Sequence, residues 1–180
     1  MRQSILAFFC IASSLAIVSA HSQVAPAATA RPFTLNAGGL GSLCQPDYKN
    51  NGFAQTSQDL YGAGAYVDAK FTRWVQIEGE GRWMRFNEYQ GINENTYLIG
   101  PRIPITNFHG LTPYGKVLVG LGNGSFLTAN TFVLAYGGGV DYRLSRRFTL
   151  RAFDFEYQEW RVSPTLWPYG GSVGISYKIF

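Results

Sequence analysis

The sequence predicts an all-β protein, an eight-stranded antiparallel up-and-down transmembrane β-barrel. Three observations lead to this prediction. Side chains alternate between apolar and polar over short segments, turn-forming residues separate these segments, and no segment has the period of a long helix. The composition agrees, because 16% of the residues are aromatic, only 14% are charged and 21 are glycine. A chain of this kind suits strands that face lipid on one side.

The first 20 residues are predicted to be a cleaved signal peptide. Arg2 supplies a positive start, residues 5–18 are almost wholly apolar, and Val18-Ser19-Ala20 ends in the small-residue pattern of a cleavage site. The apolar run is too short for a membrane-spanning helix, which needs about 20 residues. An uncleaved anchor is the alternative. We therefore expect the protein to be exported.

Residues 21–32, rich in proline and alanine, are predicted to be a flexible N-terminal segment ahead of a barrel domain at 33–180. Only Cys44 would remain after cleavage, so no intramolecular disulfide is expected. The net charge of +4 is spread along the chain without a block of lysine or arginine. This distribution gives no support to nucleic-acid binding.

Turn signals divide the barrel domain into eight predicted strands. In order, these span residues 33–44, 58–71, 73–87, 95–106, 112–123, 130–144, 147–160 and 168–180. The first follows the proline-rich segment and ends before a loop at about 45–57. The joints after the second and sixth strands resemble each other, because each runs from an acidic residue through a Thr/Ser-Arg turn into an aromatic residue.

The third strand shows the alternation most clearly. Ile77 and Trp83 share one face, whereas Glu78, Glu80 and Arg82 share the other, because successive side chains point to opposite sides of a strand. The fourth strand lies between the turn-forming stretches 87–94 and 107–110. One face of the predicted sheet is therefore apolar and the other charged or small.

The fifth strand contains Gly120, Gly122 and Gly124, which no helical pattern follows. We interpret them as glycines of a tightly curved strand rather than as a nucleotide-binding loop. The sixth, seventh and eighth strands repeat the alternation. In the seventh, Phe155 and Asp154 are predicted on opposite faces, and in the eighth, apolar and polar residues alternate over 172–179.

The end of the chain carries a motif by which the last strand of an outer-membrane barrel is presented for assembly. Its residues are Ser172, Gly174, Tyr177, Ile179 and Phe180. In the usual motif the final aromatic residue stands where Ile179 stands here, so Phe180 is an extra residue. We expect Phe180 to help assembly; the alternative is that it merely extends past the last hydrogen-bonded pair.

With this motif, the segments 97–102, 113–117 and 137–144 resemble the small outer-membrane β-barrel family that includes the OmpA transmembrane domain and the opacity-type porins. The resemblance covers residues 32–180. It implies a bacterial outer-membrane location and contact with outer-membrane lipid and with the barrel assembly machinery. Members of this family serve as adhesins, envelope-stabilising proteins or narrow pores, so the resemblance leaves the activity open.

Short turns after residues 71, 106 and 144 are expected on the periplasmic side. The longer connections at about 45–57, 87–94, 124–130 and 161–167 would then face outward, which is the asymmetry of transmembrane barrels. The loops at 45–53 and 162–168 combine aromatic with polar residues, and they are the candidate sites for a surface ligand.

The charged face is predicted to line the lumen, because its mixed signs would neutralise one another there and because aromatic residues near the strand ends suit membrane interfaces. The candidate lumen residues are Glu78, Glu80, Arg82, Arg102, Lys116, Asp141, Arg143, Asp154 and Glu156. They would form either a structural network of salt bridges or a gate. About eight strands leave an interior that side chains fill, which favours the structural network.

No catalytic, cofactor-binding or metal site is predicted. Of the two histidines, His21 lies in the N-terminal segment and His109 in a short turn, and neither has a partner at a recognisable spacing for hydrolysis. No cluster of histidine or cysteine suggests a metal. We predict a non-catalytic barrel with a structural or surface-interaction role. A narrow channel for ions or very small solutes is the first alternative, and a soluble exported barrel that binds an apolar ligand is the second.

Overall fold

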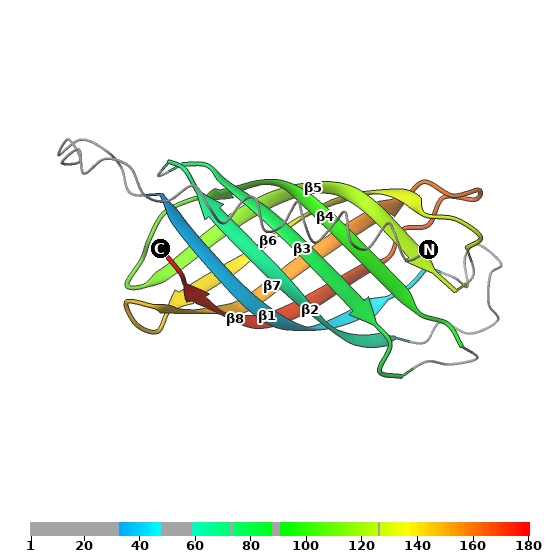
Figure 1. Cartoon of the computed structure of the whole chain (residues 1–180), viewed down its shortest axis with the longest axis horizontal. Coiled ribbons are helices and arrows are strands. Elements are labelled where there is room, and N and C mark those ends of the chain that lie inside the picture. The colour runs from blue at the N-terminus through cyan, green and yellow to red at the C-terminus, as the bar shows by residue number, and fades with distance from the viewer. Residues whose placement is uncertain (1–32, 48–58, 73, 88–90, 126) are drawn as a thin grey trace, which may run out of the picture. The chain divides into compact units, whose positions relative to one another are not determined.

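The computed structural model describes residues 33–47, 59–72, 74–87, 91–125 and 127–180, and they form a closed antiparallel β-barrel (Figure 1). The predicted signal peptide, the segment 21–32 and most of the loop at 45–57 lie outside the described residues. In the described part of the chain, no helix is long and apolar enough to cross a membrane.

Eight strands form the barrel in chain order. They are β1 (Thr34–Gln45), β2 (Leu60–Lys70), β3 (Gln76–Met84), β4 (Glu94–Pro104), β5 (Leu111–Gly124), β6 (Thr131–Arg143), β7 (Phe148–Trp160) and β8 (Tyr169–Lys178). Each strand pairs with the next, and β8 pairs with β1, so that Figure 1 shows red β8 beside blue β1. The predicted fold class is confirmed, and the strand limits differ most in β3, which is shorter than 73–87.

The connections alternate between the two ends of the barrel. Short turns join β2 to β3, β4 to β5 and β6 to β7 at the end where β1 starts and β8 finishes, which we call the turn end. The other four connections lie at the opposite end, the loop end; three of them are longer, whereas the β5–β6 connection at 125–130 is as short as the β4–β5 turn at 105–110. The two similar joints share a structure, since the Thr72 hydroxyl accepts a hydrogen bond from the Val75 N–H (3.0 Å) and the Ser145 hydroxyl from the Phe148 N–H (3.1 Å).

The outer wall is apolar and the interior is charged. Exposed side chains on the wall include Ile99, Val117 and Ile175. Aromatic pairs lie near both ends, such as Trp83 with Tyr97 towards the loop end. A soluble barrel requires the opposite arrangement, so the second alternative, a soluble barrel with an apolar internal ligand, is wrong.

One irregularity changes which side chains point inward. The consecutive β6 residues Val140 and Asp141 pair with Phe153 and Arg151 of β7. Ala152 therefore has no partner in β6 and is the extra residue of a β-bulge. The bulge shifts the alternation by one position, and both Arg151 and Asp154 are fully buried in the lumen.

Candidate functional site

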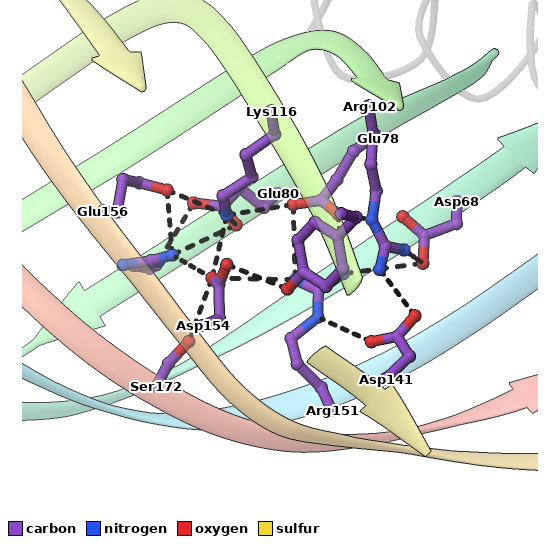
Figure 2. Close-up of polar contacts among 12 residues, drawn as sticks. Asp68, Glu78, Glu80, Arg102, Lys116, Asp141, Arg151, Asp154, Glu156 and Ser172 are labelled. Carbon is purple, nitrogen blue, oxygen red and sulfur yellow. Dashed lines mark hydrogen bonds and ion pairs between the residues drawn. The ribbon is translucent and has the colours of Figure 1, made fainter. Parts of the chain in front are cut away.

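Ten charged residues from strands β2 to β7 are joined by ion pairs in the barrel interior, and we call them the lumen network (Figure 2). They are Asp68, Glu78, Glu80, Arg82, Arg102, Lys116, Asp141, Arg151, Asp154 and Glu156. All are buried except Asp141, whose side chain is 18% exposed. Six carboxylates thus face four cationic groups.

Lys116 lies at the centre of the network. Its Nζ is 3.1 Å from Glu78 Oε1, 2.8 Å from Asp154 Oδ2 and 2.9 Å from Glu156 Oε2, and it also contacts Glu80. Arg82 contacts Glu80, Asp154 and Glu156 at 2.9 to 3.1 Å. The two cations therefore share the same group of carboxylates.

Two arginines organise the part of the network nearer the turn end. Arg102 binds Asp68 at 2.8 Å and Asp141 at 2.5 Å, and Arg151 Nη2 binds Glu78 Oε2 at 2.6 Å. The Arg102 guanidinium carbon lies 3.6 Å from the centre of the Tyr114 ring, and that of Arg151 lies 3.7 Å from the centre of the Tyr66 ring. Pairing and stacking together fix both guanidinium planes.

Apolar side chains fill the lumen between the network and the loop end. This apolar plug consists of Leu98, Leu118, Val133, Ala135, Trp160 and Leu166, with Ile92, Leu127 and Val162 packed against it. Gln158 connects the plug to the network, because it accepts a hydrogen bond from Trp160 Nε1 (2.8 Å) and donates one to Glu156 (2.6 Å). At Gly122, an added Cβ would lie 2.7 Å from the Trp160 ring.

The turn end is open instead. A cavity of about 520 Å³, which we call the turn-end vestibule, extends inward from this end. Arg102, Asp68 and Asp141 lie at its inner limit, and Arg143 and Lys178 are among the cations that line it. The lumen is therefore accessible from one end and filled at the other.

Arg143 differs from the other candidate lumen residues. It is exposed near the end of β6 and lines the vestibule, and it makes no ion pair with a described residue. Its alternation with Asp141 predicts a position on the inner face of β6, and Arg143 lies on that face. Because β6 ends at Arg143, its side chain lies in the open mouth of the barrel and not among the paired charges.

Two network residues were missing from the predicted set. Asp68 is the last buried residue on the inner face of β2, and its place in the alternation with Tyr66 was a usable signal. Arg151 was missed because strict alternation places it on the outer wall with Phe153. No sequence signal that we used marks the bulge at Ala152.

The residues of the predicted assembly motif lie on both faces of β8. Ser172 is buried and donates a hydrogen bond to Asp154 at 3.2 Å, whereas Tyr177, Ile179 and Phe180 are exposed. The backbone of Leu35 accepts a hydrogen bond from the Ile179 N–H (2.8 Å) and donates one to the Phe180 carbonyl (3.4 Å). Backbone hydrogen bonding to β1 thus continues as far as Phe180. Gly174 pairs with Leu40 in the same seam.

Carboxylate oxygens of Glu80, Asp154 and Glu156 lie within 4.8 Å of one another. Lys116 and Arg82 already neutralise these oxygens, so the group fits a salt-bridge cluster better than a metal site. Cys44 has its thiol 3.9 Å from Glu94 Oε2. His109 lies in the turn between β4 and β5 and has a positive φ of 50°.

Comparison with known proteins finds one matching family, the outer membrane protein beta-barrel domain, over residues 10–178. No curated protein sequence matches the chain. Among solved structures, Neisserial surface protein A is similar with a TM-score of 0.63 at 11% identity, covering 81% of this chain and 96% of that one.

Two further structures share the fold. The N-terminal β-barrel domain of Pseudomonas aeruginosa OprF gives a TM-score of 0.51 at 11% identity and covers 81% of this chain and 97% of that one. Ail, the attachment invasion locus protein of Yersinia pestis, gives 0.50 at 18% identity and covers 82% and 97%.

Proposed function

The chain belongs to the outer membrane protein beta-barrel domain family, and we propose that it is a non-catalytic outer-membrane barrel with a structural and surface-interaction role. Residues 1–20 direct its export and are cleaved. The turn end faces the periplasm and the loop end faces outward, as the lengths of the connections favour.

The observation that carries this proposal is the filled lumen. At mid-height the interior is occupied by the side chains of Lys116, Glu78 and Arg151, all essentially inaccessible to solvent. Above them lies the apolar plug, whose Trp160 and Leu118 are fully buried. Ions would need both layers to rearrange before they could pass, so a passive barrel is favoured over a pore.

The surface role rests on the outward connections. Similar proteins carry names that refer to a surface or to attachment, as Neisserial surface protein A and Ail do. Of the two candidate ligand loops, 162–168 sends Val162 and Leu166 into the plug, so that only part of it is free for contact. Most of the loop at 45–53 lies outside the described residues.

Planar-bilayer recording tests the filled lumen. The purified full-length chain is expected to give no discrete conductance steps under voltage. Steps in the wild-type protein that change with Lys116→Gln and persist unchanged in Arg161→Gln would contradict the proposal. Lys116 is in the lumen, whereas Arg161 is exposed at the loop end, where it pairs with Glu159.

The alternative is a narrow channel for ions or very small solutes. It is favoured by one observation, the turn-end vestibule, because an open cavity already extends from one end to Arg102. In that case, exchange of the Lys116 contacts between its four carboxylates would be the opening step. The conductance outcomes above separate the two functions.

A further inference from the structure

The turn-end vestibule carries cations that neither the lumen network nor the proposed structural role uses. Lys70, Arg143, Arg146, Arg147 and Lys178 all line this cavity. None of the five forms an ion pair with a described carboxylate, and among the described side chains only Arg147 has a hydrogen-bond partner, the Tyr177 hydroxyl at 3.0 Å. Arg147 is thus held by Tyr177, and the other four cations line the cavity without a carboxylate partner in the described part of the chain.

The two carboxylates in the vestibule do not offset these charges. Asp68 and Asp141 are both bound by Arg102, at 2.8 and 2.5 Å. Arg151 lies 3.5 Å from Asp68 as well, although its shorter contact is with Glu78 at 2.6 Å, so this layer carries at most one negative charge against the cations of the vestibule. The surplus carboxylates of the network lie deeper, around Lys116, beyond the aromatic ring of Tyr114 that stacks on Arg102.

Neutral donors line the same cavity. Asn36 and Gln76 provide amides, and Thr112, Thr149 and Ser176 provide hydroxyls. Guanidinium, ammonium, amide and hydroxyl groups are the groups that donate hydrogen bonds to phosphate oxygens in proteins. The vestibule thus combines a positive field with many hydrogen-bond donors.

We propose that the turn-end vestibule binds a small soluble polyanion that carries phosphate groups. A phosphate group bears a charge of about −1.5 to −2, so a ligand with two or three of them matches the four cations without a described partner, with or without Arg147. The cavity volume of about 520 Å³ lies within the range of about 300–1,000 Å³ that small-molecule sites occupy.

The position of the cavity favours a soluble ligand over a lipid headgroup. Lys70 and Lys178 share the inner face with Asp68 and Ser176, because residues two apart in a strand point to the same side. Lipid headgroups at the membrane surface are expected to meet the outward-facing side chains instead. With the plug and the network beyond it, the vestibule is closed at its inner end, so the ligand enters and leaves through the turn end.

Isothermal titration of the folded full-length chain with inorganic tripolyphosphate tests this inference. The barrel is held in a zwitterionic detergent at about 0.1 M salt, where the Debye length is about 10 Å. We expect saturable binding with one site per barrel. The triple variant Lys70→Gln, Arg143→Gln, Lys178→Gln is expected to weaken binding at least about tenfold, or about 1.4 kcal/mol.

The matched control is Arg161→Gln, which removes a positive charge at the loop end, and its affinity should stay within about twofold of wild type, since most of its charge is screened at that distance. The single variant Lys178→Gln should show a smaller loss than the triple variant in the same direction. A gel shift on boiling verifies that each variant is folded. Absence of saturable wild-type binding, or an equal loss in the control, overturns the proposal.

A second arm separates the two sources of phosphate. The barrel is placed in nanodiscs of zwitterionic lipid with or without phosphatidylglycerol. For a soluble ligand, tripolyphosphate affinity should be the same in both discs. Competition by phosphatidylglycerol that disappears in the triple variant would instead assign the vestibule to lipid headgroups and would overturn the inference of a soluble ligand.

Discussion

At the scale of single residues, Lys116 illustrates how the interior depends on pairing. Its ammonium group is enclosed by four carboxylates and has no access to solvent. Charges in such a position are tolerable only while each has its partners, because removal from water costs several kcal/mol per ion. The network is therefore sensitive to the loss of any central member.

We predict that Lys116→Ala lowers the free energy of unfolding by about 3–5 kcal/mol, because it leaves buried carboxylates without a cation. Urea titration of the protein folded into lipid vesicles measures this. Arg161→Ala is the control, because the Arg161 side chain is 63% exposed and its pair with Glu159 is expected to contribute about 0–1 kcal/mol. Equal losses in the two variants would contradict the argument.

The apolar plug provides a second residue-scale prediction. Gly122→Ala would place a Cβ 2.7 Å from both the Trp160 ring and Val133 Cγ2, and overpacking of this kind costs about 1–3 kcal/mol. Gly79→Ala is the matched control, since nothing lies within 4 Å of its Cβ position. Unfolding titrations should show a loss for Gly122→Ala and none for Gly79→Ala; comparable stability would mean that the plug is loosely packed.

The sequence located most of the network residues but not all of them. Glu78, Glu80 and Arg82 follow from alternation alone, because a strand without irregularities has a strict period of two. Arg151 does not, because one extra residue at Ala152 moves it from the outer face to the inner face. The partner of Arg151 in the lumen is Glu78, which is 73 positions away in the chain, so no local pattern indicates this contact.

At the scale of strands, closure depends on the seam between β1 and β8. These strands are paired from Asn36 with Lys178 to Gln45 with Tyr169. Beyond β8, the Ile179 N–H and the Phe180 carbonyl still bond to the backbone of Leu35. The last two residues therefore extend the seam to the turn end, although the strand itself finishes at Lys178.

We predict that deletion of Phe180 reduces the fraction of the protein inserted into membranes, since it removes the exposed terminal aromatic residue and the bond to Leu35. Fractionation followed by gel shift measures the inserted fraction. Phe108→Ala is the control, because it removes an aromatic residue of similar exposure, 62% against 68%, at the same end but outside the seam. Insertion at the wild-type level after deletion would show that Phe180 is dispensable.

At the scale of the whole molecule, closure leaves no free strand edge, because each strand is hydrogen-bonded on both sides. In lipid, this is the condition under which strands can span a membrane, since unpaired backbone groups are costly there. The charged interior and the apolar wall are then parts of the same arrangement.

We predict that the protein from the outer-membrane fraction migrates differently in mild detergent before and after boiling, because the closed barrel resists unfolding until heated. Gel electrophoresis of the two samples measures this. Lys116→Ala should lose the shift at a lower temperature than Arg161→Ala. A protein that remains in the soluble fraction and shows no shift would contradict the membrane assignment.

The sequence by itself determined the fold class and the number and approximate limits of the strands, because these depend on local alternation and on turn residues. It also indicated the face that turns inward, through the mixed charges of one face and the aromatic residues near the strand ends. The tertiary structure decided the rest. The bulge that turns Arg151 inward, the plug formed by Trp160 and Leu166, and the cations gathered around the vestibule arise only when distant strands are brought into register. Such contacts join residues far apart in the chain, and no local pattern contains them.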